Sequence, residues 1–249
     1  MNPIFAYCRV SISPVRGEMK DSAEQVTQLL FGEIICVQEK NNNWIKIQTL
    51  LDGYEGWMDE KQISYLTESE MESWSKDQKI CTKSIKINTP VGKMVLPVGA
   101  FVSVNNPYKF KIGKGVFQTN YKFTKTKLLT LAKSYLNTPY LWGGKSNFGI
   151  DCSGFTQIVF RSQEIELPRD ASKQVFLGEE ITRSNSKAGD VAFFTNDAGR
   201  VIHVGILLSK NKIIHASGRV KIDKLDNQGI WSEELSAYSH ALFKIKRFK

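Results

Sequence analysis

The sequence predicts an α+β protein, and three patterns along the chain support this fold class. Residues 1 to about 66 and 80 to about 121 contain short apolar runs separated by turn residues, which is typical of strands. After residue 124, apolar side chains recur at helical spacing. Strand patterns return from residue 191 to 248. Helices followed by a run of strands predict helices packed on an antiparallel sheet.

Composition narrows the class of protein. The chain has 249 residues, of which 41% are hydrophobic, 24% charged and 11% aromatic, as expected for a folded chain of more than one domain. The net charge of +9 fits an anionic partner, but the basic residues are scattered, so we do not expect nucleic-acid binding. No apolar run approaches the ~18 residues of a membrane span.

The amino terminus and the cysteines indicate the compartment. Residues 1–9 lack a basic start followed by an apolar core, so no secretory leader is visible. We therefore expect a cytoplasmic protein, or a secreted one if a leader has been removed. The four cysteines show no Cys-x-x-Cys spacing and only three histidines are present, so we expect neither a metal site nor another cofactor. The sequence does not indicate an oligomeric state, and a monomer is expected.

The strands of the first 66 residues follow a recognisable order. An apolar run at residues 27–37 contains Gly-Glu, residues 44–48 alternate with period two from Trp44, and residues 53–58 read Gly-Tyr-Glu-Gly-Trp-Met. This order resembles bacterial SH3-like domains. We expect domain boundaries at 1–66 for this SH3-like barrel, 67–79 for a connector, 80–121 for a second, degenerate SH3-like barrel and 124–249 for the last domain.

Cys152 is the strongest candidate nucleophile. It follows a glycine-rich loop at residues 140–146 and stands at the start of a predicted helix, which Asp151 can cap. A helix N-terminus combines unpaired N–H groups with the positive end of the macrodipole, and both favour a thiolate. We therefore expect Cys152 to attack a carbonyl carbon.

Two histidines interrupt otherwise apolar strands. A hairpin centred on Ser209 predicts that His203 lies directly opposite His215, with Gly205 on the same face leaving room for the Cys152 helix. We expect His203 to be the base, within hydrogen-bond reach of the sulfur in a thiolate–imidazolium pair, and His215 to orient its ring. His240 has no such partner in the pattern and is interpreted as structural.

Six blocks of the last domain match one family in order. They are Thr-Pro-Tyr-Leu-Trp-Gly-Gly, Asp-Cys-Ser-Gly-Phe, Leu-Pro-Arg-Asp, Ala-Gly-Asp-Val-Ala-Phe-Phe, His-Val-Gly-Ile and Ile-Ile-His-Ala-Ser-Gly. The chain resembles the NlpC-type family of papain-like cysteine peptidases, which cleave peptidoglycan stem peptides. The two SH3-like domains resemble a subgroup that hydrolyses the bond between γ-D-glutamate and a diamino acid and requires a free N-terminal L-alanine.

The resemblance implies roles in the last domain. Tyr140, with the backbone N–H of Cys152, would stabilise the oxyanion, and Trp142 would line the substrate cleft. Asp151 would bind the ammonium group of the substrate, and Ser153 the α-carboxylate of γ-D-glutamate.

The resemblance implies further substrate contacts. Tyr54 and Glu18 of the first SH3-like domain would reach the ammonium group, with Glu55 as a rival for Glu18. Asp170 and Ser172 would also contact substrate. Here Ala171 stands where relatives commonly carry a serine.

Three other functions stay open. A wall-acting endopeptidase anchored by the SH3-like domains would hydrolyse whole peptidoglycan and tolerate a blocked amine. Another papain-like chemistry, an amidase or acyltransferase, would use the same nucleophile. A non-enzymatic wall-binding protein is disfavoured by the Cys152, His203 and His215 set.

Overall fold

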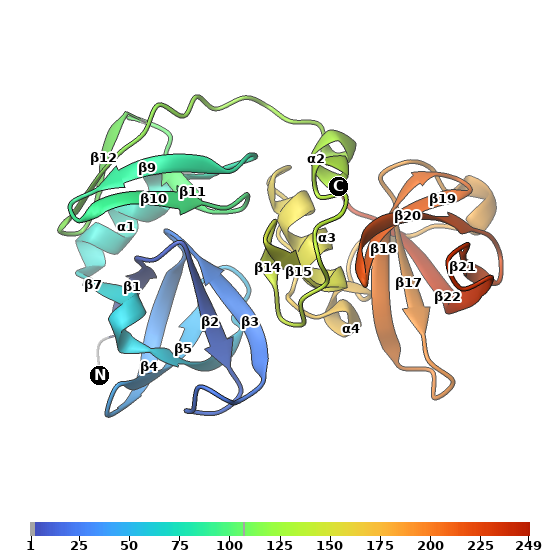
Figure 1. Ribbon diagram of the computed structural model, residues 1–249, viewed down its shortest axis with the longest axis horizontal. Helices are drawn as coiled ribbons and strands as arrows, with labels where there is room; N and C mark the ends of the chain where they lie inside the picture. Colours follow the sequence, from blue (N-terminus) through green and yellow to red (C-terminus); the bar gives the residue numbers. More distant parts are fainter. Residues whose placement is uncertain (1–2, 107) are drawn as a thin grey trace. The chain divides into compact units, whose positions relative to one another are not determined.

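The chain folds into two compact units. The computed structural model describes residues 3–106 and 108–249 (Figure 1). The first unit ends at Lys125 and the second begins at Thr126, two residues after the start that the sequence predicts for the last domain.

The first unit opens with a seven-stranded antiparallel sheet of short strands. Its strand β5 (Trp44–Thr49) alternates buried and half-buried residues, as the period-two pattern predicts. Ile45, Ile47 and the neighbouring strands enclose one apolar core. The strand order is β3-β2-β6-β5-β4-β1-β7. The other strands are β1 (Ile4–Cys8), β2 (Ile12–Arg16), β3 (Gln25–Leu30), β4 (Ile34–Asn41), β6 (Glu55–Asp59) and β7 (Ile63–Leu66), with the 3-10 turn η1 (Glu60–Gln62) before β7.

The predicted connector forms helix α1 (Glu68–Asp77). It begins at a capping box in which Thr67 and Glu70 satisfy each other's backbone N–H groups. On its buried side, the Trp74 indole donates a 2.8 Å hydrogen bond to the carbonyl of Gly32 and stacks on the ring of Phe110. The helix therefore packs against both halves of the first unit.

Two small antiparallel sheets complete the first unit. Where the sequence predicts a second barrel, at residues 80–121, the structure has two separate sheets, with strand orders β10-β9-β13-β12 and β11-β8. Their strands are β8 (Gln78–Ile80), β9 (Ile85–Thr89), β10 (Gly92–Leu96), β11 (Phe101–Ser103), β12 (Lys109–Ile112) and β13 (Gly115–Gln118).

The second unit begins with short helices. Helix α3 (Cys152–Arg161) is buried along its whole length and lies against β18 (Val201–Ser209) and β19 (Lys212–Ser217). The others are α2 (Leu128–Ser134), α4 (Ala171–Gln174) and the 3-10 turn η2 (Arg183–Asn185), and a small hairpin joins β14 (Lys145–Ser146) to β15 (Gly149–Ile150). No helix in the described ranges is both long and apolar enough to cross a membrane.

A seven-stranded antiparallel sheet forms the rest of the second unit, in the order β16-β22-β17-β18-β19-β20-β21. Because the long strand β22 (Ala237–Arg247) pairs with both β17 and β21, the sheet closes on itself (Figure 1). The remaining strands are β16 (Glu179–Glu180), β17 (Val191–Thr195), β18 (Val201–Ser209), β19 (Lys212–Ser217), β20 (Arg219–Leu225) and β21 (Gly229–Ser232).

The predicted fold class therefore holds in part. The antiparallel sheet of the last domain is present, but strands dominate the described chain and its helices are short. The expected architecture of helices packed on a sheet is corrected to a closed sheet with the buried helix α3 and the short helix α4 against it.

Candidate active site

Cys152 is the first residue of α3, as the sequence predicts. Asp151 caps the helix, because its carboxylate accepts a 2.7 Å hydrogen bond from the N–H of Gly154. The glycine-rich loop packs directly on this first turn. A Cβ added to Gly154 would lie 2.3 Å from the carbonyl oxygen of Gly144, so a larger residue would push the loop away.

The Cys152 sulfur is enclosed by protein. Burial raises the pKa of the Cys152 thiol to about 12, and the charge of Asp151 acts in the same direction. Hydrogen bonds from the backbone of Val204 and Ser153, and the charge of Arg169, favour the thiolate but do not outweigh burial. The raised pKa of this thiol favours a protonated sulfur at rest, whereas the sequence predicts a thiolate–imidazolium pair.

His203 and His215 form the predicted pair. The Nε2 atom of His203 lies 2.8 Å from Nδ1 of His215, and the two rings meet edge to face with centroids 5.0 Å apart. Both rings are buried. Burial, followed by the charges of His240 and His215, places the pKa of His203 well below its usual value. His203 is therefore a neutral base at rest.

The strand register differs from the prediction. His215 pairs with Gly205, not with His203, because the hairpin turns at Lys210 and Asn211 and not around Ser209. The pairing also shifts by one residue between Leu207 and Ser209. His203 reaches His215 diagonally on the same face. The role expected for Gly205 is also corrected: an added Cβ would lie 2.8 Å from the Cβ of His215, so Gly205 makes room for that histidine.

The sulfur and the base are neighbours without a direct bond. The sulfur is held by the backbone of Val204, the residue after His203. Among the hydrogen bonds of these described side chains, none joins the sulfur to the His203 ring. The expected contact is absent in this state, and such bonds commonly tighten only when substrate is present.

Tyr140 lies at the junction of the loop and the sheet. Its N–H donates a 2.9 Å hydrogen bond to the carbonyl of Gly218, and its backbone forms a bridge with Ile150, two residues before Cys152. Burial raises the pKa of the Tyr140 hydroxyl, as do the charges of Cys152 and Asp151. The hydroxyl therefore keeps its proton at neutral pH and stays a hydrogen-bond donor.

The Asp151 carboxylate is paired with a buried arginine. The Arg169 guanidinium donates to both of its oxygens, at 3.0 and 2.5 Å, and also donates to the Ser153 hydroxyl at 2.9 Å. One of these oxygens further accepts the N–H of Gly143. This fork ties the helix cap to Ser153, and it means that an ammonium group would have to share the carboxylate with Arg169.

The other predicted residues of the second unit are accessible. Trp142 is 60% exposed, which decides against a buried packing role. Asp170 is half-buried and precedes α4, although its side chain makes no capping bond. Ser172 is exposed and lines a cavity of about 710 Å³ with Phe176 and Arg200.

Tyr54 and Glu18 belong to the first unit. Tyr54 is half-buried and its N–H donates to the hydroxyl of Thr49, while Glu18 is exposed and pairs with Lys20 at 2.6 Å. The rival Glu55 is exposed and bonded to Gln38. Their reach to a substrate ammonium stays a prediction.

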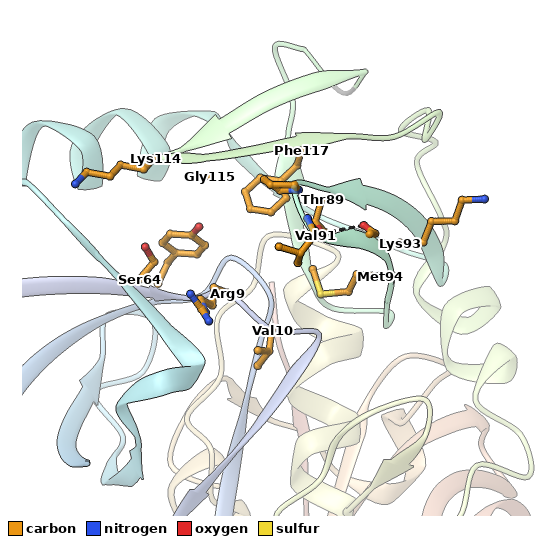
Figure 2. Close-up of a pocket in the computed structure, with 13 residues that line it drawn as sticks. Arg9, Val10, Ser64, Thr89, Val91, Lys93, Met94, Lys114, Gly115 and Phe117 are labelled. Carbon is orange, nitrogen blue, oxygen red and sulfur yellow. Dashed lines mark hydrogen bonds between the residues drawn. The ribbon is translucent and has the colours of Figure 1, made fainter. Parts of the chain in front are cut away.

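The first unit also contains a cavity of about 540 Å³. Figure 2 shows its lining by the 89–94 hairpin, Val10 and Phe117, with Arg9 at one side. None of the described residues that line it is a predicted site residue.

Three residues of the second unit were missed. Arg169 holds Asp151, and Asp223 lies 3.0 Å from Nε2 of His215. The expectation that His240 lacks a partner is wrong, because its ring stacks on His203 with centroids 4.0 Å apart. A charged Asp223 inside a strand is an unusual pattern that could have drawn attention. The described residues contain no group of three His, Cys, Asp or Glu side chains arranged to hold a metal ion.

Comparisons with known proteins identify two matched regions of the chain. The NlpC/P60 family matches residues 137–239, and the bacterial dipeptidyl-peptidase SH3 domain matches residues 15–63. A gamma-D-glutamyl-L-lysine dipeptidyl-peptidase of Bacillus cereus is 28% identical over 245 residues, covering 85% of this chain and 74% of the relative. A murein DD-endopeptidase/LD-carboxypeptidase of Escherichia coli is 39% identical over 95 residues, covering 37% of this chain and 50% of the relative.

Solved structures show the same fold. An NlpC/P60 family protein from Bacillus cereus superposes with a TM-score of 0.80 at 21% identity, covering 98% of this chain and 99% of that one. An NlpC/P60 endopeptidase from Photobacterium damselae gives a TM-score of 0.72 at 18% identity, covering 96% of this chain and 70% of that one. The chain therefore joins a bacterial dipeptidyl-peptidase SH3 domain to a cysteine-peptidase domain of the NlpC/P60 family.

Proposed function

We propose that the protein hydrolyses the bond between γ-D-glutamate and the diamino acid of murein stem peptides that carry a free N-terminal L-alanine. One observation carries this proposal. The buried Cys152 thiol contacts the backbone of Val204, and the ring of the preceding residue, His203, is hydrogen-bonded to His215. Two relatives named gamma-D-glutamyl-L-lysine dipeptidyl-peptidase support the substrate class.

The chemistry begins with proton transfer. His203 takes the proton of the Cys152 thiol as the sulfur attacks the γ-carbonyl carbon of D-glutamate. The carbonyl oxygen becomes an oxyanion, to which the Tyr140 hydroxyl and the N–H of Cys152 donate. When the carbon–nitrogen bond breaks, His203 gives its proton to the leaving amine. Water then hydrolyses the thioester with His203 as the base, which releases L-Ala-γ-D-Glu and restores the thiol.

The two charged ends of the dipeptide have separate binding groups in this proposal. Ser153, which already accepts a hydrogen bond from Arg169, would bind the α-carboxylate of γ-D-glutamate. Asp151 would bind the ammonium group together with Tyr54 and Glu18. Asp151 already neutralises Arg169, and a carboxylate paired in this way attracts a second cation less strongly than an unpaired one does. Binding of the ammonium group would therefore depend more on Tyr54 and Glu18.

Further contacts belong to the more accessible residues of the second unit. Trp142 would line the cleft, and Asp170 and Ser172 would contact substrate from the segment around α4. We further propose that the enzyme acts as a monomer in the recycling of imported peptides, where a reducing cytoplasm keeps Cys152 reduced.

The test is incubation with L-Ala-γ-D-Glu-diaminopimelate, its lysine analogue and an N-acetylated control, with products identified by mass spectrometry. We expect release of L-Ala-γ-D-Glu from the free peptides only. Cys152→Ala should abolish turnover and keep the fold, whereas Cys36→Ala, which changes a cysteine of the first unit, should leave turnover unchanged. Equal cleavage of the acetylated peptide and release of fragments from intact peptidoglycan would instead support a wall endopeptidase.

A further inference from the structure

Asp223 is a buried acid whose contacts extend the histidine pair. It lies in β20, next to β19, which carries His215. Its Oδ2 atom is 3.0 Å from Nε2 of His215 and 3.3 Å from Nζ of Lys221. A buried charge is unfavourable unless it is paired and hydrogen-bonded, so these contacts define its state.

The contacts of Asp223 fix the proton on His215. Burial raises the pKa of the Asp223 carboxyl, but the contacts with His215 and Lys221 outweigh burial and leave this pKa below its usual value. At neutral pH the carboxylate can only accept hydrogen bonds. The hydrogen between it and His215 must therefore be on Nε2 of the imidazole.

The tautomer of His215 determines that of His203. A neutral His215 with its hydrogen on Nε2 presents Nδ1 as an acceptor. Because this Nδ1 lies 2.8 Å from Nε2 of His203, the hydrogen of that contact belongs to His203. The Nδ1 atom of His203 is then the nitrogen whose lone pair remains to take a proton.

We propose that Asp223 is a positioning residue that sets the tautomers of both His215 and His203 and so leaves Nδ1 of His203 as the base for Cys152. This inference rests on the proposed function for its catalytic consequence, but its structural content does not need a substrate. When the thiol proton moves to Nδ1, His203 keeps its Nε2 hydrogen and becomes an imidazolium. The chain His203–His215–Asp223 then places a fixed negative charge behind that new positive charge.

A purely structural role for Asp223 is less consistent with its surroundings. Lys221 also pairs with Glu234 at 3.1 Å, so it keeps a carboxylate partner without Asp223. The Nε2 atom of His215, in contrast, has Asp223 as its only hydrogen-bond partner among the described residues. His240 faces the pair as a third ring, stacked on His203, and its own Nδ1 is 2.9 Å from the Ser239 hydroxyl.

Nitrogen-15 NMR of the imidazole rings tests the proposal directly. The chain has three histidines, so the signals can be assigned with His→Gln variants. We expect the Nε2–H tautomer for both His203 and His215 in the wild-type protein at neutral pH. A doubly protonated His215, or a hydrogen on Nδ1 of neutral His203, would overturn the proposal without any variant being needed.

Variants separate positioning from folding. In Asp223→Ala, we expect His215 to lose its tautomer preference and kcat to fall about 10- to 100-fold with a smaller change in KM. Asp223→Asn can present its amide oxygen to Nε2–H, so it should restore the tautomer and part of kcat. Glu234→Ala, which removes the other carboxylate of Lys221, is the matched control and should change neither.

The outcomes of the two proposals are distinguishable. If the tripeptide is not cleaved but the tautomers are as stated and depend on Asp223, the proposed function fails and the positioning role stands. If the tripeptide is cleaved and the tautomers or kcat do not respond to Asp223→Ala in a folded variant, the positioning role fails.

Discussion

The Cys152 thiol is protonated at rest because burial opposes the helix end. The first turn of α3 supplies the N–H of Ser153, and β18 supplies that of Val204, yet removal of the sulfur from water has the larger effect. His203 is neutral for the same reason. A neutral pair avoids two buried charges before substrate arrives, and the ion pair forms only as the proton moves.

Alkylation of Cys152 by iodoacetamide should therefore depend steeply on pH. The pKa of this thiol is raised to about 12, so the thiolate fraction grows about tenfold per pH unit between about pH 6 and 9. The rate at the Cys152 peptide, measured by mass spectrometry, should rise accordingly, and His203→Ala should change it little at neutral pH. A rate that is flat across this range would show a resting thiolate instead.

At the scale of elements, the strand pair β18–β19 assembles the base. The register shift between Leu207 and Ser209 sets Gly205 opposite His215. This register puts the His215 ring on the same face as His203, and the missing side chain of Gly205 leaves room for it. The helix α3 lies against both strands, and the contact of Gly154 with Gly144 joins its first turn to the glycine-rich loop.

Gly205→Ala should displace His215. The added Cβ would lie 2.8 Å from the Cβ of His215 and from Ile213, so we expect a loss of about 1–3 kcal/mol in the free energy of unfolding. Because the His203–His215 bond is disturbed, kcat should also fall. Denaturant unfolding and steady-state kinetics measure both effects. Gly17→Ala, where the new Cβ meets only Val26 at 3.6 Å, is the control, and an equal effect there would contradict this reasoning.

At the scale of the whole molecule, the chain couples a small strand-built SH3 domain to the peptidase domain. Arg169 already engages the carboxylate of Asp151. Strong selectivity for substrates with a free N-terminal amine therefore needs additional hydrogen-bond acceptors for the ammonium group. Tyr54 and Glu18 of the first unit are the residues proposed for this.

Selectivity for a free amine should depend on Tyr54 and Glu18. Tyr54→Phe and Glu18→Gln each remove a hydrogen-bonding or charged group, and we expect kcat/KM for the free tripeptide to fall about tenfold or more. Cleavage of the N-acetylated peptide should not fall in parallel. Glu55→Gln is the matched control; a loss with this variant and not with Glu18→Gln would assign the role to Glu55.

Local pattern was sufficient for the start of α3, its cap at Asp151 and the placement of both histidines on strands, because these depend on neighbours within a few residues. The closure of the sheet by β22 and the shifted register of β18 and β19 depend on pairings between distant strands and on a bulge that periodicity does not encode. The partners Arg169, Asp223 and His240 reach the site only when the chain folds. Burial, which decides the protonation of Cys152, is likewise a property of the assembled core and not of a residue's neighbours in sequence.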